Sequence, residues 1–295
     1  MKKHKDNARS RRRGGVLIPA IVTLLLAVLI LGGITLYDVL SAQRTYGVTF
    51  YQMTSDRVSR NIRFLLLTDL HLREYGEDNA ALLADVAALS PDVILLGGDL
   101  VTYGVEGYDN MLSMCGRLAQ IAPSFMVMGN HEDEKTFLDG DGELVQHFAD
   151  TGVSVLRNRT QTLTVGEDEV EIVGISGNEN GFEQYGGRSC MDALTDDYAG
   201  LRVVMAHIPT LFPEALESYA FDLGVAGHTH GGIIRLPRFG GLYTKEEGLL
   251  PTYDGGRFAL QNGATLVVSR GLGNSGVIPR VFNRPELVVI DVNWY

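Results

Sequence analysis

Hydrophobic residues fall along this chain in one long run, followed by a series of short runs. The long run covers residues 14–37, contains no charged residue and is rich in Leu, Ile and Val. As a helix rising about 1.5 Å per residue, it is long enough to cross the roughly 30 Å hydrocarbon core of a bilayer. A cleaved signal peptide is the alternative, but its apolar core is usually about 7–15 residues long. The pattern therefore favours an uncleaved transmembrane anchor over residues 14–37.

Basic residues precede the long apolar run. Residues 1–13 contain seven Lys or Arg and one acid. Because basic flanks stay on the cytoplasmic side, we expect a basic cytoplasmic tail over residues 1–13, a single-pass anchor in the cell membrane, and an extracytoplasmic remainder. Arg11 and Arg12 also resemble a twin-arginine export signal, which is a weaker match than a plain basic flank.

Short apolar runs alternate with helical patterns from residue 59 onward, after a polar segment over residues 38–58 that we expect to form a stalk. An unbroken apolar run predicts a strand covered on both faces, and apolar residues three or four apart predict a helix. The predicted strands cover residues 62–68, 93–96, 125–128, 153–156, 161–165, 170–175, 202–206, 223–226, 265–269 and 287–292. The predicted helices cover residues 80–89, 108–121, 144–149 and 210–218. This alternation predicts an α/β domain over residues 59–295.

Two features interrupt the alternation. Between residues 153 and 175, short runs separated by turn residues predict antiparallel strand pairs. The loops over residues 178–198 and 237–262 are rich in Gly and aromatic residues, and they are long enough to suggest function.

The charge of the domain limits its partners. Outside the tail, 18 basic residues stand against 35 acidic ones, a net charge of −17. A body this acidic has no general attraction for nucleic acid, so a local positive centre must attract any anionic substrate. The two cysteines, Cys115 and Cys190, form no CxxC pair, which excludes a zinc ribbon and leaves a single disulfide open.

Metal-type ligands follow five of the predicted strands. In chain order they are Asp69 and His71, then Asp99, then Asn130 and His131, then His207, and finally His228 and His230. One such group could be a cap or a turn former, but a turn does not need the two imidazoles of Gly-His-Thr-His-Gly-Gly over residues 227–232. In α/β sheets the carboxyl ends of neighbouring strands converge on the working site. The five groups together therefore predict a metal site.

The set closely resembles the signature of the calcineurin-like metallophosphoesterases: Asp-x-His, Gly-Asp, Gly-Asn-His-Glu, a lone His, and Gly-His-x-His. The resemblance covers roughly residues 61–293. Together with the Gly-His-Thr-His-Gly-Gly run, Ser-Arg-Gly-Leu-Gly (269–273) and Phe-Asn-Arg-Pro-Glu-Leu (282–287) resemble the membrane-anchored bacterial branch of that family. The resemblance implies a four-layer α/β/β/α sandwich, here preceded by one N-terminal transmembrane helix.

The resemblance also implies two divalent metal ions. It places one on Asp69, His71 and His230, the second on Asn130, His207 and His228, and Asp99 as a bridge between them. Mixed carboxylate, imidazole and amide ligands suit Mn²⁺, Fe²⁺ or Zn²⁺. Two ions about 3.5–4 Å apart can clamp the attacking and leaving oxygens of a phosphoryl displacement. With two carboxylates and a bridging hydroxide, such a centre keeps a net positive charge that attracts a phosphate anion.

Four further residues have expected roles near this centre. His131 resembles the catalytic histidine of the family, which protonates the leaving alkoxide, and Glu132 is expected to orient it. Arg270 and Arg280 are weaker candidates for contact with the substrate phosphate, because an arginine near a loop is more often a structural partner.

We therefore expect a membrane-anchored dinuclear-metal phosphohydrolase in which a metal-bridging hydroxide attacks a phosphodiester or pyrophosphate bond. A phosphomonoesterase using the same site stays open, because the same clamp serves both substrates. A non-catalytic metal-binding membrane module is the alternative from a different class. The anchor suggests a lipid-linked or cell-envelope phosphate ester as substrate, and the acidic body suggests no nucleic-acid partner.

Overall fold

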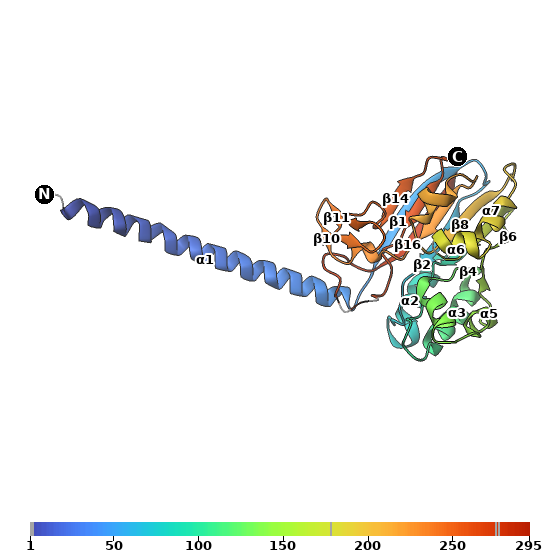
Figure 1. The fold of residues 1–295 in the computed structure, drawn as a ribbon, viewed down its shortest axis with the longest axis horizontal. Coiled ribbons are helices and arrows are strands. Elements are labelled where there is room, and N and C mark those ends of the chain that lie inside the picture. The colour runs from blue at the N-terminus through green and yellow to red at the C-terminus, as the bar shows by residue number, and fades with distance from the viewer. Residues whose placement is uncertain (1–2, 178, 275, 277) are drawn as a thin grey trace.

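The computed structural model describes residues 3–177, 179–274, 276 and 278–295. Two six-stranded sheets pack face to face, helices cover the outer face of each sheet, and one long helix projects from the body (Figure 1). The predicted α/β class is confirmed.

The first sheet has the strand order β1-β16-β2-β3-β4-β5. These strands are β1 (Gly47–Ser55), β16 (Glu286–Trp294), β2 (Ile62–Leu67), β3 (Val93–Leu96), β4 (Ser124–Met126) and β5 (Ser154–Val155). Strands β2 to β5 run parallel, β16 is antiparallel to β2, and β1 is parallel to β16. The carboxyl ends of β2, β3 and β4 therefore meet at one edge of the sheet.

The second sheet has the order β14-β15-β9-β8-β7-β6. Its strands are β14 (Gly256–Ala259), β15 (Thr265–Val268), β9 (Leu223–Ala226), β8 (Leu201–Ala206), β7 (Asp168–Ile175) and β6 (Arg159–Val165). The four central strands are parallel and the two outer strands are antiparallel to their neighbours. Two small hairpins follow β9: β10 (Arg235–Leu236) with β11 (Gly240–Gly241), and β12 (Tyr243–Thr244) with β13 (Gly248–Leu249).

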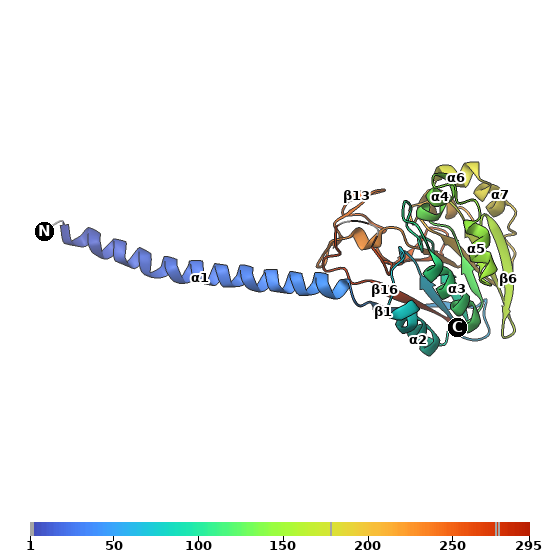
Figure 2. The ribbon, with the colours of Figure 1, turned by 90° about the horizontal axis from the view of Figure 1, so that it is seen from below.

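Helices cover both outer faces of the sheet pair (Figure 2). On the first sheet they are α2 (Ala80–Leu89), α3 (Asp109–Ile121), α4 (Asn130–Phe137) and α5 (Leu144–Asp150), with the short turn η1 (Glu77–Asn79). Those nearest the second sheet are α6 (Glu179–Gln184), α7 (Gly187–Asp192) and the π-helical turn η2 (Phe212–Leu216). A last turn, η3 (His230–Gly232), follows β9.

Three apolar clusters separate these layers. Between the sheets, Phe64 and Leu66 of β2 pack with residues of the second sheet such as Val203. On the outer face of the first sheet, Leu65 and Leu67 pack under α2 and α3. A third cluster lies on the outer face of the second sheet, under η2 and α7. The arrangement is the predicted four-layer sandwich, and it explains the unbroken apolar run in β2: alternate side chains enter two different cores.

The structure corrects the stalk expected over residues 38–58. Helix α1 (Lys3–Ala42) continues to residue 42, and β1 begins at Gly47 and pairs with β16 over nine residues. Tyr51 and Met53 of β1 pack against the cluster between the sheets. The alternation of half-buried and exposed residues along β1 gives no apolar run, because an edge strand is covered on one face only. The folded domain therefore begins near Gly47, and not at residue 59.

Smaller differences concern single elements. The helix expected over residues 210–218 is only the π-helical turn η2, in which Pro213 lies near the start. Of the strands between residues 153 and 175, β6 and β7 are antiparallel as predicted, but β5 pairs in parallel with β4. Residues 179–198 contain α6 and α7, whereas residue 178 lies outside the described residues.

The two cysteines lie in different layers. Cys115 of α3 is buried in the cluster outside the first sheet, and Cys190 of α7 packs against the cluster outside the second sheet. Both thiols are free. The disulfide left open by the sequence is therefore absent from this fold.

One candidate membrane span occurs among the described residues. Within α1, Pro19–Ala42 is long and apolar enough to cross a bilayer, and only its last residue, Ala42, is buried against the domain. In Figures 1 and 2 this helix projects away from the sandwich. The structure thus contains the predicted N-terminal apolar helix, which is suited to anchoring the chain in a membrane.

Strand β1 should be required for a stable domain. We expect a fragment beginning at Thr45 to unfold cooperatively, and a fragment beginning at Ser59 to melt about 10 °C lower or more, because each kcal/mol lost lowers the midpoint by about 2–4 °C in a domain of this size. The shorter fragment leaves one edge of β16 unpaired. Circular dichroism melts of the two fragments measure the difference, and equal midpoints would contradict the assignment of β1 to the core sheet.

Candidate metal centre

The seven candidate metal ligands lie in the loops that follow five parallel strands. Asp69 and His71 follow β2, Asp99 follows β3, Asn130 follows β4, His207 follows β8, and His228 and His230 follow β9. Five of them have positive φ angles, between 48° and 70°: Asp69, His71, Asp99, His228 and His230. Non-glycine residues adopt this conformation at a cost of about 1–3 kcal/mol each, and such strain clusters at functional sites. The backbone therefore marks this edge of the two sheets as a site.

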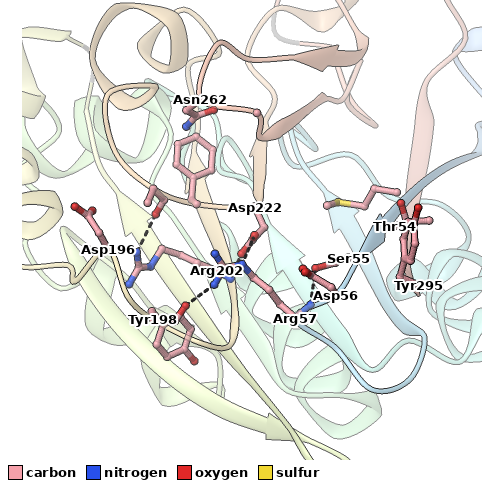
Figure 3. Close-up of a pocket in the computed structure, with 14 residues that line it drawn as sticks. Thr54, Ser55, Asp56, Arg57, Asp196, Tyr198, Arg202, Asp222, Asn262 and Tyr295 are labelled. Atoms are coloured by element: carbon pink, nitrogen blue, oxygen red, sulfur yellow. Dashed lines mark hydrogen bonds and ion pairs between the residues drawn. The ribbon is translucent and has the colours of Figure 1, made fainter.

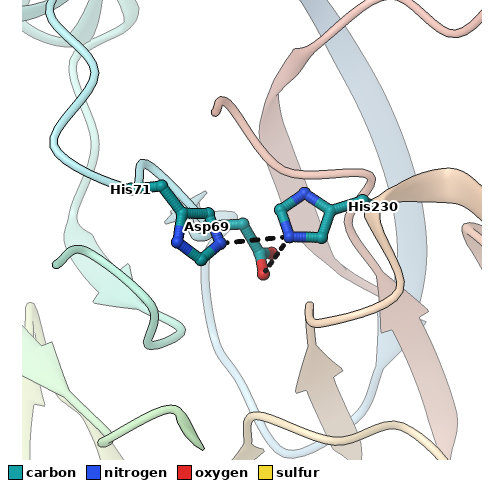
Figure 4. Close-up of side chains that lie close together, drawn as sticks. All are labelled: Asp69, His71 and His230. Carbon is teal, nitrogen blue, oxygen red and sulfur yellow. Dashed lines mark hydrogen bonds and ion pairs between the residues drawn. The ribbon is translucent and has the colours of Figure 1, made fainter. Parts of the chain in front are cut away.

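Asp69, His71 and His230 form one group, shown in Figure 4. The Nε2 atoms of His71 and His230 are 3.1 Å apart, and Nε2 of His230 is 3.6 Å from Oδ1 of Asp69. The three side chains converge on one point although they come from two different sheets. One candidate ligand atom from each residue lies within 4.8 Å of the others.

Asp99, His207 and His228 form a second group of the same kind. Nε2 of His207 lies 3.2 Å from Oδ2 of Asp99 and 3.2 Å from Nδ1 of His228. Asp99 is also close to the first group, because its Oδ2 is 3.6 Å from Nε2 of His71. The Asp99 carboxylate thus lies between the two groups, as a bridging ligand would.

Asn130 supplies an independent sign that a cation belongs here. Its Oδ1 atom is buried and has no hydrogen-bond partner among the described residues. An unsatisfied buried polar atom costs about 1–3 kcal/mol. A divalent cation near His207 would satisfy this oxygen, so the residues present fit a metal centre.

Glycines keep the space around the carboxylates open. A Cβ atom at Gly227 would overlap the Asp69 carboxylate, and one at Gly129 would overlap the Asp99 carboxylate. These glycines begin the Gly-His-x-His and Gly-Asn-His-Glu motifs. The motifs therefore need glycine because loops from neighbouring strands approach within contact distance.

Glu132 has a different role from the one expected. The sequence suggests that it orients His131, but its buried carboxylate instead accepts the backbone N–H groups of Asp99, Leu100, Val101 and Gly129 at 2.6–3.0 Å. Burial, reinforced by the charge of Asp99, raises the pKa of Glu132 to about 7, although the N–H donors oppose the shift. Glu132 thus ties the Asp99 loop to the start of α4.

Other contacts orient the histidine rings. Nδ1 of His207 donates to the carbonyl oxygen of Gly97 at 2.7 Å, which leaves Nε2 facing Asp99. Nε2 of His228 lies 2.7 Å from Oε1 of Glu246, which leaves Nδ1 facing the second group. Such outer partners fix the ring nitrogen that is presented to a metal. Sequence patterns alone do not reveal Glu246, because it is 18 residues away in the loop between β12 and β13.

Burial and charge divide the histidines into two classes. Burial lowers the pKa of His71 to about 4, and burial also lowers the pKa of His230 well below its usual range. Burial also opposes charge on His207, but the carboxylates of Asp99 and Asp69 outweigh it and raise the pKa of His207 to about 10. His71 and His230 therefore present neutral rings, whereas a metal at His207 would have to displace a proton.

His131 lies beside the first group. Its ring packs edge-on against His71 with centroids 4.6 Å apart, and its Nδ1 accepts the backbone N–H of Tyr103 at 3.0 Å. Because Nδ1 accepts, the neutral ring carries its proton on Nε2. His131 thus presents its Nε2–H group as a hydrogen-bond donor.

The two candidate arginines are held by other parts of the protein. Arg280 is buried, donates to the carbonyl oxygen of Gly273 at 2.9 Å and contacts Nδ1 of His230 at 3.1 Å. Arg270 forms an ion pair with the buried Glu286. Both guanidinium groups therefore support the loops behind the site, and this geometry favours the structural role over contact with substrate.

A pocket of about 330 Å³ adjoins the second group. Asn130 and His207 line it, together with Phe137, Leu138 and Tyr185. The rings of Phe137 and Tyr185 stack with centroids 6.4 Å apart, and both are exposed. The loop around Tyr185 thus borders the candidate centre, as expected of a loop that contributes to specificity.

A separate cavity of about 500 Å³ lies near the end of β1 and the start of β8 and β9 (Figure 3). Two arginines that line it pair within the protein: Nε of Arg57 is 2.9 Å from Asp222, and Arg202 pairs with Glu171. None of the seven candidate ligands lines it. This cavity lies at the opposite ends of the strands from the candidate centre.

The sequence of this chain matches one family of known proteins. The family described as calcineurin-like phosphoesterase matches residues 62–232, more than half of the chain. Phosphodiesterase YaeI of Escherichia coli K12 is 28% identical over 239 residues, covering 78% of this chain and 82% of that protein. The uncharacterized metallophosphoesterase YkuE of Bacillus subtilis 168 is 27% identical over 240 residues, covering 78% of each. A transmembrane protein with metallophosphoesterase domain from Danio rerio is 23% identical over 288 residues, covering 90% of this chain and 61% of that protein.

Replacing Glu132 with Gln should weaken the site through the backbone. The amide has one acceptor oxygen where the carboxylate has two, so at least one of the four buried N–H groups loses its partner. We expect the free energy of unfolding to fall by about 1–3 kcal/mol. Urea denaturation measures this change.

Glu106→Gln is the matched control, because Glu106 is exposed and accepts none of these four N–H groups, which bond to Glu132. It should change the unfolding free energy by less than about 0.5 kcal/mol. If both variants are as stable as the wild type, Glu132 does not hold the Asp99 loop.

Proposed function

The chain belongs to the calcineurin-like phosphoesterase family and is a metal-dependent phosphoesterase, and we propose that it is a membrane-anchored phosphohydrolase with two divalent metal ions. The family resemblance carried by its motifs is confirmed. The single observation that most supports two ions is the position of Asp99, whose Oδ2 lies 3.6 Å from His71 and 3.2 Å from His207. One carboxylate thus faces two separate sets of ligands.

In this proposal the ligands divide as the two groups do. Asp69, His71 and His230 hold one ion, Asn130, His207 and His228 hold the other, and Asp99 is shared. The donor set of carboxylate, imidazole and amide, with no thiolate, suits Mn²⁺, Fe²⁺ or Zn²⁺. When bound, two such ions would supply a hydroxide nucleophile by lowering the pKa of a bridging water, and they would neutralise charge on the phosphate.

His131 supplies the proton in this proposal. In this proposal Nε2 faces the leaving oxygen, because the backbone N–H of Tyr103 contacts Nδ1. The ring acts as an acid in its doubly protonated form: Nδ1 takes up a proton and releases the Tyr103 N–H, Nε2 gives its proton to the leaving alkoxide oxygen, and the ring returns to the neutral form. General acid catalysis of this kind contributes about 10²–10⁴-fold to the rate. The arrangement supports an enzyme over a non-catalytic metal-binding module, because a module needs the ligands but not a positioned proton donor.

We infer that the substrate is a phosphodiester or a pyrophosphate. The pocket beside Asn130 and His207 gives room for a substituent on the far side of the phosphate, and a phosphomonoester would leave it unused. The Escherichia coli relative is named a phosphodiesterase. A phosphomonoester is the second candidate, because the metal clamp itself does not distinguish the two. A lipid-linked or cell-envelope phosphate ester agrees with the anchor.

Two substitutions should separate metal binding from proton transfer. Asp99→Asn should lose both ions, because the shared ligand is weakened, and should abolish most turnover. His131→Ala should keep both ions and lose about 10²–10⁴-fold in turnover of bis-p-nitrophenyl phosphate. Plasma emission spectrometry of Mn²⁺-loaded protein and a colorimetric assay measure the two effects.

Asp196, which is exposed, and His147, which is half-buried, provide matched controls. Asp196→Asn and His147→Ala should leave metal content and turnover unchanged. Normal turnover in His131→Ala would show that His131 is not the general acid. If the wild-type protein binds Mn²⁺ but hydrolyses neither phosphomonoesters nor phosphodiesters, it is a metal-binding module and not an enzyme.

We propose that residues 1–13 lie in the cytoplasm and the sandwich lies outside it, because seven basic residues precede the span. Bacterial alkaline phosphatase is active only outside the cytoplasm, so a fusion after Tyr295 should be active in bacterial cells. A green fluorescent protein fused at the same position should be dark when exported by the general secretory route. The opposite pair of results would reverse the topology.

A further inference from the structure

Exposed apolar side chains gather in the loops nearest the anchor. They are Leu236, Phe239, Tyr243, Leu249, Leu250, Ile278 and Phe282, and we call them the apolar loop surface. Figures 1 and 2 place the β10–β13 hairpins at the end of the body from which α1 projects. Phe239 and Leu249 are each 74% exposed. Exposed apolar side chains concentrated at one end of a domain mark an interaction site.

Direct contacts fix these loops to the end of the membrane span. The backbone N–H of Phe282 donates to the carboxylate of Asp38, within the last turns of α1. The backbone N–H of Arg235, at the start of the β10–β11 hairpin, donates to the carbonyl oxygen of Val281 at 2.9 Å. The segment that carries Leu236 and Phe239 is therefore tied to the segment that meets the anchor.

The connection between span and domain is too short to lift the domain away. The span ends at Ala42 and β1 begins at Gly47, so four residues link them. Fully extended, such a link reaches no more than about 3.6 Å per residue. The guanidinium group of Arg73 also donates to the carbonyl oxygen of Ala42 at 3.2 Å, which holds the end of the helix against the domain.

Charge on this side of the domain is opposite to the charge of the whole. Arg44, Arg238, Lys245 and Arg284 are exposed, and none forms a salt bridge among the described residues. The neighbouring acids are already engaged: Glu246 pairs with His228, and Glu247 accepts backbone N–H groups of Thr252 and Tyr253. An acidic body with unpaired cations around an apolar surface suits anionic lipid headgroups.

We propose that the apolar loop surface docks on the bilayer that holds α1, and that the substrate phosphate is carried by a lipid in that bilayer. The docking hairpins are continuous with the candidate centre: Glu246, between β12 and β13, contacts His228, and Gly241 of β11 packs against Gly232 of the His230 turn. A headgroup beside these hairpins is thus next to the ligands of the centre. The substrate half of this inference rests on the proposed phosphohydrolase function.

Docking can be measured by tryptophan fluorescence, which needs no enzyme activity. Trp294 is the only tryptophan of the chain, so each probe reports from one position. It lies at the far end of β16, opposite the end at which β1 begins, so it should stay in water. The full chain is reconstituted in vesicles of one part phosphatidylglycerol to three parts brominated phosphatidylcholine. Phe239→Trp in a Trp294→Phe background should lose most of its emission to bromine quenching, and the native Trp294 should keep its emission.

Equal emission from the two proteins would overturn the docking. The emission of the Phe239→Trp probe is also recorded in detergent at high protein concentration. If its blue shift there equals the blue shift in vesicles, a second copy of the chain, and not the bilayer, covers the surface. Because this readout needs no metal, it stays valid if the protein turns out to have no turnover.

The proposed lipid substrate is tested by measuring how phosphate compounds inhibit the turnover of bis-p-nitrophenyl phosphate. Phosphatidic acid in the vesicles should inhibit the full chain about tenfold or more strongly than glycerol 3-phosphate in solution, because docking raises its effective concentration at the centre. The ratio should approach one in a Phe239→Ser, Leu249→Ser variant and stay unchanged in Trp294→Ser. If the two phosphates inhibit the wild type equally while quenching shows docking, the proposal of a lipid substrate is wrong, and the docking and the phosphohydrolase function are unaffected.

Discussion

The Asp99 carboxylate is the point on which the candidate centre depends, and backbone hydrogen bonds set its position. Glu132 accepts the N–H groups of Asp99, Leu100 and Val101, and the N–H of His131 donates to Oδ1 of Asp99 at 2.9 Å. Oδ2 is thereby turned toward both histidine groups. A carboxylate held in this way needs no rearrangement when cations bind, and preorganisation of this kind is what a charged site requires.

The two sheets serve this geometry by bringing five parallel strands to one edge. β2, β3 and β4 approach from the first sheet, and β8 and β9 from the second, with the apolar cluster between them holding the sheets in register. The first ligand group takes Asp69 from one sheet and His230 from the other, so the centre exists only when both sheets are packed. The fold and the site therefore share one core, and the outer helices complete it from outside.

Much of this organisation follows from the sequence because apolar strands that end in metal-type ligands are readable in one dimension. Strand limits at Val93–Leu96 and Leu223–Ala226 match the predicted runs, and the candidate ligands meet where parallel strand ends must meet. β1 was missed because an edge strand alternates polar and apolar residues. The roles of Glu132, Tyr103 and Glu246 were missed because they act through backbone groups or across distant loops, which leave no spacing pattern.

Crystals of the protein loaded with Mn²⁺ offer the most direct test of the central claim. Anomalous difference maps should show two peaks about 3.5–4 Å apart, one on each side of Asp99, with Asn130 and His207 beside one peak and His71 and His230 beside the other. No peak at Asp99, or peaks only at sites away from these side chains, would contradict a dinuclear centre.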